Sequence, residues 1–170
     1  MLREFAVFYR RTLEDSADLI VFAREMEQTK RYFTFEVARF GADRVEMEMR
    51  IDPRVEDMLV PPFLLQPLVE NAVRHAMPSE GKLTIEVTGE VTGNDVIVRV
   101  CDNGVGMTEE ARCNILHPES SLGLGIAVKN VHDRICGYFG PGTHMEVESE
   151  LGKGTCVILV LKEGALREYQ

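Results

Sequence analysis

The spacing of hydrophobic residues changes several times along the chain, and each change marks a predicted element. Apolar positions recur every three or four residues through residues 1–40, which predicts two helices joined by a polar turn. Ser16 or Asp18 is a suitable cap for the second helix. Residues 45–51 then alternate between apolar and charged side chains, and this period of two predicts a strand with one solvated face.

A long apolar helix and two hairpins account for much of the remaining pattern. The helix follows the Pro-Pro pair at residues 61–62, and we expect it to begin near Gln66 because Pro67 removes one backbone hydrogen bond. Apolar residues alternate on both sides of the turns at 92–95 and 151–154, which predicts the two hairpins.

The segment between the hairpins combines a loop and a helix. Residues 107–122 lack strong periodicity, and we expect a mobile loop with one helical turn. Residues 125–139 have helical spacing. The apolar positions of this predicted helix are Ile126, Val128, Val131, Ile135 and Tyr138.

The order of these elements predicts the fold class. Hairpins outnumber crossover connections, so we expect an α+β two-layer sandwich with a mixed, mostly antiparallel sheet and helices on one face. We expect a helical segment over residues 1–40, one domain over residues 41–162 and a frayed tail over residues 163–170.

The composition excludes several classes of partner. With 19 Lys and Arg against 28 Asp and Glu, the net charge is −9, which disfavours binding to nucleic acid or to an anionic membrane surface. The 4 cysteines are widely spaced without a zinc-binding pattern, and we interpret them as small buried side chains in a reducing cytosol. No apolar run approaches the length of a membrane span or a signal peptide, so we expect a cytoplasmic chain.

The first group of chemistry-bearing residues lies on the long apolar helix. Asn71, Arg74 and His75 share one helix face by their spacing, with Glu70 beside them. An amide oxygen can ligate Mg²⁺, and a guanidinium can balance phosphate charge. The competing interpretation is a solvated helix face with an ordinary ion pair between Glu70 and Arg74.

Two glycine-rich segments add a second and a third group. Asp102 ends a valine-rich strand, where its carboxylate could accept a hydrogen bond from an exocyclic amine such as that of adenine. Gly104 and Gly106 follow and allow a close approach of backbone to a flat base, although such residues also form ordinary turns. Gly123 and Gly125 open the next helix, whose N-terminus could bind phosphate or could simply form a hinge.

Taken in this order, the three groups resemble the Bergerat ATP-binding fold of DNA gyrase, heat-shock chaperones, histidine kinases and MutL. The chain resembles most the catalytic domain of the LytS-type sensor histidine kinases, over roughly residues 5–162. The segments that carry this resemblance are YFTFEVARFGADRVEMEMRIDP, PPFLLQPLVENAVRHAM, DNGVGM, GIAVKNVHDRI and GKGTCVILV.

The resemblance implies a role for each matching residue. Asn71 matches the asparagine that binds Mg²⁺, and Asp102 matches the acid that recognises adenine. Glu70 matches a water-activating carboxylate of related ATPases, or in kinases a base toward the phosphoacceptor histidine. The remaining matches are Arg74 and His75 toward phosphate, Gly104 and Gly106 at the base pocket, residues 107–124 as the ATP lid, Gly123 and Gly125 as its phosphate-side glycines, and Thr155 as a support of the adenine pocket.

The chain departs from the family pattern at two places. Ala127 replaces the second glycine of the usual Gly-Ile-Gly-Leu run, which puts full ATP affinity or lid closure in question. The phosphoacceptor motif of His followed by Phe-Leu-Phe-Asn is absent, and LREFAVFYRRTL resembles the segment that family members carry directly after that motif. The resemblance therefore implies a domain that starts just after the acceptor histidine, with residues 1–17 as the remainder of dimerisation helices.

The implied function is Mg-ATP-dependent phosphoryl transfer to a histidine in a two-component system. The implied cofactors are ATP and Mg²⁺, and the implied partners are a dimerisation and phosphoacceptor domain and a response regulator. The longer protein would be a membrane-bound homodimer with this domain in the cytosol. Three alternatives stay open, namely a serine kinase of the anti-sigma-factor type, a nucleotide-gated binding module without transfer, and a hydrolase that uses Glu70 to activate water.

Overall fold

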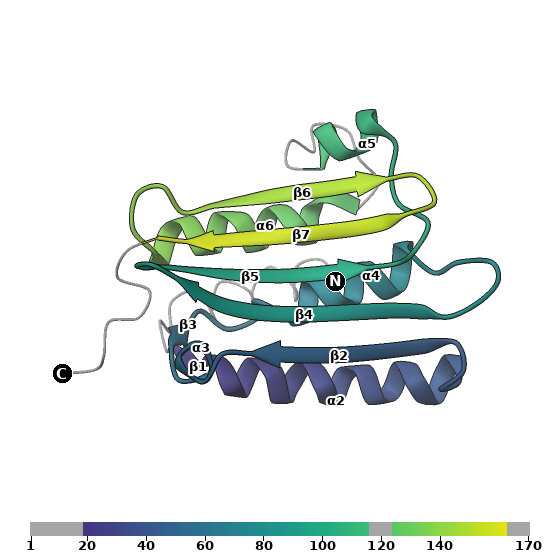
Figure 1. Ribbon diagram of the computed structural model, residues 1–170, viewed down its shortest axis with the longest axis horizontal. Helices are drawn as coiled ribbons and strands as arrows, with labels where there is room; N and C mark the ends of the chain where they lie inside the picture. The colour runs from purple at the N-terminus through teal and green to yellow at the C-terminus, as the bar shows by residue number, and fades with distance from the viewer. Residues whose placement is uncertain (1–18, 116–123, 163–170) are drawn as a thin grey trace, which may run out of the picture.

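A central sheet of five strands organises the molecule (Figure 1). The computed structural model describes residues 19–115 and 124–162. The strand order is β2-β4-β5-β7-β6, in which β2 and β4 are parallel and all other neighbours are antiparallel. The strands of this sheet are β2 (Val45–Ile51), β4 (Leu83–Thr92), β5 (Asp95–Asp102), β6 (His144–Glu150) and β7 (Gly154–Leu161).

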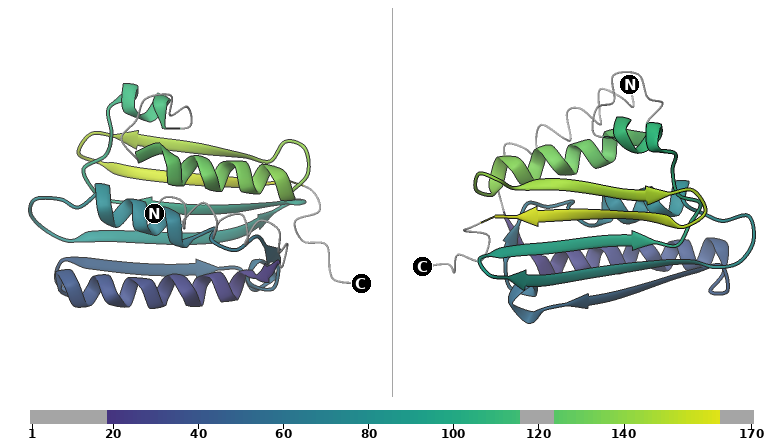
Figure 2. Two further views of the ribbon diagram at one scale, coloured as in Figure 1. Left: turned by 180° about the vertical axis from the view of Figure 1, so that it is seen from behind. Right: turned by 45° about the horizontal axis from the view of Figure 1, so that its top comes forward.

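Helices cover one face of this sheet, and the described residues place no helix on the other face (Figure 2). The covering helices are α2 (Phe22–Phe40) beside β2, α4 (Gln66–His75) against β4 and β5, and α6 (Leu124–Tyr138) against β6. The connection from β2 to its parallel neighbour β4 contains α4, as a parallel crossover requires. The predicted α+β two-layer fold with a mixed, mostly antiparallel sheet is confirmed.

Alternation along the strands places the core between the two layers. On β5 the side chains of Val96, Val98 and Val100 are buried under the helices, while the intervening side chains point to the open face. The helices contribute their apolar stripes to the same core, including Phe22, Leu68 and Val131. Ile126 and Tyr138, which the helical spacing suggested as apolar positions of α6, are instead exposed.

The start of α2 differs from the sequence prediction. The helix begins at Phe22, after an extended Val21 that offers no side-chain cap, so the prediction of a cap at Ser16 or Asp18 is wrong. Instead, β1 (Ile20–Val21) pairs antiparallel with β3 (Leu59–Val60), and the Phe22 N–H donates to the Met58 carbonyl at 2.8 Å. A tertiary contact satisfies the donor that a capping side chain would have satisfied.

Short elements complete the described chain. The strand β2 ends at Ile51, as the alternation over residues 45–51 predicts, and α3 (Pro53–Glu56) follows because the Asp52 carboxylate accepts the Arg54 N–H at 2.8 Å. The single helical turn expected after residue 107 is α5 (Glu109–Asn114), capped by the Thr108 hydroxyl. The rest of that predicted loop, residues 116–122, and the predicted tail over residues 163–170 lie outside the described residues.

The cysteines correct the prediction of buried thiols. Cys101 and Cys156 lie opposite each other on β5 and β7 and form a disulfide on the open face of the sheet. Cys113 and Cys136 are free and exposed. The sequence pattern could not show that Cys101 and Cys156 are cross-strand neighbours, because they are 55 positions apart in the sequence.

Across the two described stretches, 19–115 and 124–162, no helix is both long enough and apolar enough to cross a membrane.

Candidate nucleotide site

A cavity of about 190 Å³ lies between α4 and the adjoining ends of β5 and β7. Most of its wall is apolar, with few polar groups, as is typical of small-molecule sites. The apolar lining comes from Leu68, Ala72, Ala76, Val100, Met107 and Val157. The remaining lining residues are Asn71, His75, Asp102, Gly106 and Thr155.

Asp102, at the end of β5, is the acidic group of this cavity. One carboxylate oxygen, Oδ1, accepts the backbone N–H of Gly104 at 2.9 Å and that of Thr155 at 3.3 Å. The second oxygen, Oδ2, has no hydrogen-bond partner among the described residues, so it can accept a donor from a ligand. Burial raises the pKa of Asp102, and the two backbone hydrogen bonds oppose this shift. The backbone therefore fixes the orientation of the Asp102 carboxylate, and one of its two oxygens remains free to accept a hydrogen bond from a ligand.

The two glycines after Asp102 allow the loop to pack closely against neighbouring backbone. A Cβ at Gly104 would lie 2.1 Å from the carbonyl oxygen of Ala76, at the C-terminal end of α4. Gly106 has a φ of +67°, and a Cβ there would lie 2.0 Å from the carbonyl oxygen of Glu150. Of the two, Gly106 lines the cavity and Gly104 does not. Both positions therefore need glycine for close approach to protein backbone.

Ser149 is a site residue that the sequence analysis missed. Its hydroxyl accepts the Met107 N–H at 2.9 Å and lies 2.8 Å from the hydroxyl of Thr155. It also lies 3.0 Å from the Gly154 carbonyl oxygen. Ser149 thus fastens the loop after β5 to the hairpin that carries Thr155. The signal that could have found it is the pairing of residues 149 and 155 across the predicted hairpin.

Only some of the polar residues of α4 lie at the cavity. Asn71 and His75 line the cavity, whereas Glu70 and Arg74 do not. The Glu70 carboxylate instead accepts a hydrogen bond from Gln66 at 2.8 Å, and both Glu70 and Arg74 lie close enough to Tyr32 of α2 to affect its pKa. The predicted common face of Asn71, Arg74 and His75 therefore does not form a common wall of the cavity.

The charge state of His75 follows from its position. Desolvation lowers the pKa of His75, and the nearby Arg74 lowers it further. The imidazole is therefore neutral at pH 7, and it can donate or accept a hydrogen bond without adding positive charge to the cavity.

The phosphate-side glycines lie at the limit of what the structure describes. Gly125 is buried as the second residue of α6. Gly123, the other glycine predicted there, and the rest of residues 116–123 of the predicted lid lie outside the described residues.

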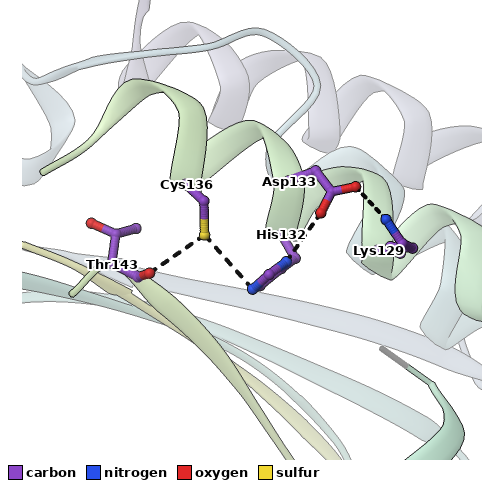
Figure 3. A network of polar contacts seen from close by, with 5 residues as sticks. All are labelled: Lys129, His132, Asp133, Cys136 and Thr143. Atoms are coloured by element: carbon purple, nitrogen blue, oxygen red, sulfur yellow. Dashed lines mark hydrogen bonds and ion pairs between the residues drawn. The ribbon is translucent and has the colours of Figure 1, made fainter. Parts of the chain in front are cut away.

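A second polar group lies on α6, outside the cavity, and includes a cysteine, a histidine and an aspartate (Figure 3). His132 contacts Asp133 at 3.3 Å and the Cys136 sulfur at 3.7 Å, and that sulfur lies 3.4 Å from the Thr143 carbonyl oxygen. Burial and Asp133 raise the pKa of the Cys136 thiol, which disfavours the thiolate that a nucleophile needs. The group links α6 to the residue before β6 and does not form a reactive centre.

Similarity to known proteins agrees with this geometry. A sequence profile of the histidine kinase-, DNA gyrase B-, and HSP90-like ATPases matches residues 63–165. The sensor protein LytS of Bacillus cereus is 34% identical over 175 aligned residues, covering 100% of this chain. The sensor histidine kinase/phosphatase LytS of Staphylococcus aureus is 33% identical over 156 residues, covering 88% of this chain. The chain spans only 29% and 26% of these two relatives.

Solved structures show the same fold. The catalytic domain of histidine kinase ThkA superposes with a TM-score of 0.64 at 19% identity, over 86% of this chain and 96% of that domain. The histidine kinase AdeS of Acinetobacter baumannii gives a TM-score of 0.60 at 18% identity, over 86% of this chain and 67% of the other.

Proposed function

Because the chain belongs to the family of histidine kinase-, DNA gyrase B-, and HSP90-like ATPases, we propose that it is the ATP-binding catalytic domain of a LytS-type sensor histidine kinase. The observation that carries this proposal is the Asp102 carboxylate, held by two backbone N–H groups with its second oxygen free beside an apolar cavity. That oxygen would accept the exocyclic amine of adenine, and the apolar wall would contact the base.

The residues of the cavity also fit the metal and phosphates of Mg-ATP. Asn71 offers an amide oxygen at the cavity wall, and the described residues contain no cluster of three or more His, Cys, Asp or Glu side chains that would hold a metal alone. Mg²⁺ commonly takes few protein ligands and completes its shell with phosphates and water. We assign Asn71 to Mg²⁺, His75 and Gly125 to the phosphate side, and Gly106 and Thr155 to the base pocket.

Glu70 and Arg74 receive no nucleotide contact in this proposal. They do not line the cavity, and both lie near enough to Tyr32 of α2 to affect its pKa. Any part they play in the reaction is toward another protein surface, such as the domain that carries the acceptor histidine.

In the longer protein, this domain would present the γ-phosphoryl group of Mg-ATP to a histidine of the dimerisation domain. The phosphoryl group would then pass to a response regulator. Such transfer depends mainly on positioning and charge neutralisation, and Mg²⁺ supplies much of the neutralisation when it is bound. We place the longer protein in a membrane as a homodimer, with this domain in the cytosol.

Calorimetric titration of the chain with ATP and Mg²⁺ tests the binding half of the proposal. We expect binding of the wild-type chain, a large loss in Asp102→Asn, and a loss confined to the Mg²⁺-dependent part in Asn71→Ala. Glu70→Gln is the matched control on the same helix, and its affinity should stay within about two-fold because Glu70 lies outside the cavity. Unchanged binding in Asp102→Asn would contradict the proposed adenine contact.

A separate assay tests transfer. A LytS-type dimerisation domain with its histidine is supplied with radiolabelled Mg-ATP and this chain, and we expect the label on the histidine. Binding without transfer would favour a nucleotide-gated module, and steady ADP release without a labelled protein would favour a hydrolase. Label on serine would favour the serine-kinase alternative.

A further inference from the structure

The turn of residues 62–65, directly before α4, is held by groups from two other helices. The helix has no side-chain cap of its own, because Leu65 occupies the capping position. Phe63 within the turn has a φ of +60°, the only positive value at a non-glycine position in the parts of the chain that are described. Such a conformation persists only where surrounding contacts fix it.

Glu25 of α2 supplies the first set of contacts. Its carboxylate accepts the backbone N–H of Phe63 at 2.6 Å through Oε1, and those of Leu64 and Leu65 at 2.9 and 3.1 Å through Oε2. The side chain is 0% exposed. Three charge-assisted hydrogen bonds hold a carboxylate that has lost its water, and they fix the backbone of the three residues that lead into α4.

Arg134 of α6 supplies the second set. Its guanidinium donates through Nη1 to the carbonyl oxygens of Pro62 and Phe63, at 2.8 and 3.2 Å. The N–H side of the turn is thus bound from α2 and the carbonyl side from α6. Glu25 thus accepts hydrogen bonds from the N–H groups of this short segment, and Arg134 donates hydrogen bonds to its carbonyl groups.

We propose that Glu25 and Arg134 are positioning residues of the nucleotide site, acting through this turn. A helix is stiff along its axis, so the turn that starts α4 sets the place of every later residue on it. Asn71 follows five residues after Gln66, about 7.5 Å along the axis, and His75 lies one turn further. The position of Asn71 and His75 in the cavity wall therefore depends on residues that do not touch the cavity. The inference rests on the proposed nucleotide site.

The charge of Glu25 is the testable element. Glutamine has nearly the same shape, but its NH₂ group is a donor and would face backbone donors at one side of the turn. Glu25→Gln should therefore release part of residues 63–65 while the fold is kept. Arg134→Met keeps the apolar stem and removes both donors, and because Arg134 is not fully buried this variant is expected to fold even where Glu25→Gln does not.

The experiment measures Mg-ATP affinity by calorimetry and thermal stability on the same samples of the 170-residue chain. We expect about ten-fold weaker Mg-ATP binding in Glu25→Gln and about three-fold weaker binding in Arg134→Met, at a temperature where each variant is fully folded. The side-chain amide signal of Asn71 in the nitrogen-15 NMR spectrum of the ligand-free variants should shift as well. A purely structural role would not move that signal or the affinity of the folded fraction.

Two control variants separate positioning from general stability. Met26→Ala removes a buried side chain of the same helix and leaves every hydrogen bond to the turn in place, so it should lower the melting temperature but leave affinity unchanged. Glu27→Gln changes an exposed charge of α2 and should alter neither.

Unchanged affinity and an unmoved Asn71 signal in both Glu25→Gln and Arg134→Met would overturn the inference. An equal loss of affinity in Met26→Ala would also overturn it. Absence of Mg-ATP binding to the wild-type chain would instead refute the proposed function, so the two failures are distinguishable.

Discussion

Among the described residues, two carboxylates each accept more than one backbone N–H group, and they differ in how many acceptor positions remain free. Glu25 places both oxygens on three N–H groups of the turn before α4 and is fully buried. Asp102 lines a cavity and accepts two N–H groups through one oxygen, and its other oxygen has no hydrogen-bond partner among the described residues. Both oxygens of Glu25 therefore accept hydrogen bonds from the protein, whereas Asp102 is held in orientation by one oxygen and keeps the other as a free acceptor.

This difference separates a carboxylate that builds the fold from one that can bind a ligand. A buried charge without a full set of donors is costly, so an incompletely satisfied carboxylate needs a compensating function or partner. The raised pKa of Asp102 has the same origin, because desolvation is its main cause. Loss of the two charges should therefore have opposite consequences.

The largest expected effect comes from removal of the saturated carboxylate. Glu25→Leu leaves three N–H groups without their acceptor, and we expect the free energy of unfolding to fall by about 3–5 kcal/mol. Urea denaturation followed by circular dichroism measures this change. Glu27→Leu, on the exposed side of the same helix, should change it by less than about 0.5 kcal/mol. Similar values for the two variants would show that the buried contacts of Glu25 contribute little.

Asp102→Asn should weaken ATP binding without lowering the free energy of unfolding. Its amide oxygen can still accept the N–H groups of Gly104 and Thr155, but the free position loses its charge, and we expect about 100-fold weaker ATP binding, which corresponds to about 2.7 kcal/mol. Because the pKa of Asp102 is raised by folding, its ionised form costs stability at every pH above the unfolded value of about 4.

The pH dependence provides the check. The asparagine variant should be at least as stable as the wild type at pH 7, and its advantage should shrink as the pH falls and Asp102 becomes protonated in both states. Denaturation midpoints at pH 7 and pH 4 measure this. A variant less stable than the wild type at pH 7 would mean that Asp102 serves the fold as Glu25 does.

Ser149→Ala tests the support of the ligand-facing carboxylate. The substitution removes the acceptor of the Met107 N–H and the contact with Thr155, with an expected cost of about 1 kcal/mol in unfolding free energy. ATP affinity should fall by a few-fold because the loop and hairpin at Asp102 become less well fixed. Ser149→Thr keeps the hydroxyl and should recover part of both losses; if alanine and threonine behave alike, the hydroxyl is not the relevant group.

His144→Gln should have the smallest effect on stability, and it shows how much an exposed ion pair contributes. Hydrogen bonding to the Gly142 carbonyl oxygen and to Glu146 raises the pKa of His144. Its stabilising contribution is therefore fully present below pH 6.5 and is lost as the pH rises through the higher folded value. Since the pair is exposed, we expect less than about 0.5 kcal/mol and no change in ATP affinity. Equal stability differences at pH 5.5 and pH 8.5 would exclude a contribution from the charged imidazole.

The sequence predicts most of this fold because its strands and helices have clear periods. The hairpins around residues 92–95 and 151–154 and the start of α4 at Gln66 follow from alternation and from the position of Pro67. The strands β1 and β3 have only two residues each, too few to show a period, and the start of α2 depends on their pairing. The prediction of domain boundaries at residues 40 and 162 remains a prediction.

The site is less predictable than the fold because its parts meet through tertiary contacts. Helical spacing placed Asn71, Arg74 and His75 on one face, but it could not show that Asn71 and His75 line the cavity while Arg74 does not. The role of Glu25 is also invisible in the local pattern, because its partners lie 38 to 40 residues away in sequence.

The pairing of β5 with β7 determines when a nucleotide pocket can exist during folding. Asp102 and Thr155 lie directly opposite each other across this pair, although they are 53 positions apart in the sequence. The hairpins β4–β5 and β6–β7 join strands that are neighbours in the sequence. The strands β5 and β7 must instead meet across a long intervening segment that contains α5, α6 and β6, and contacts between such distant residues form more slowly. A state with both hairpins formed but not yet joined would have no complete cavity. Mg-ATP would then bind only the fully assembled sheet, and at 100 times its dissociation constant it would raise the free energy of unfolding by about 2.7 kcal/mol.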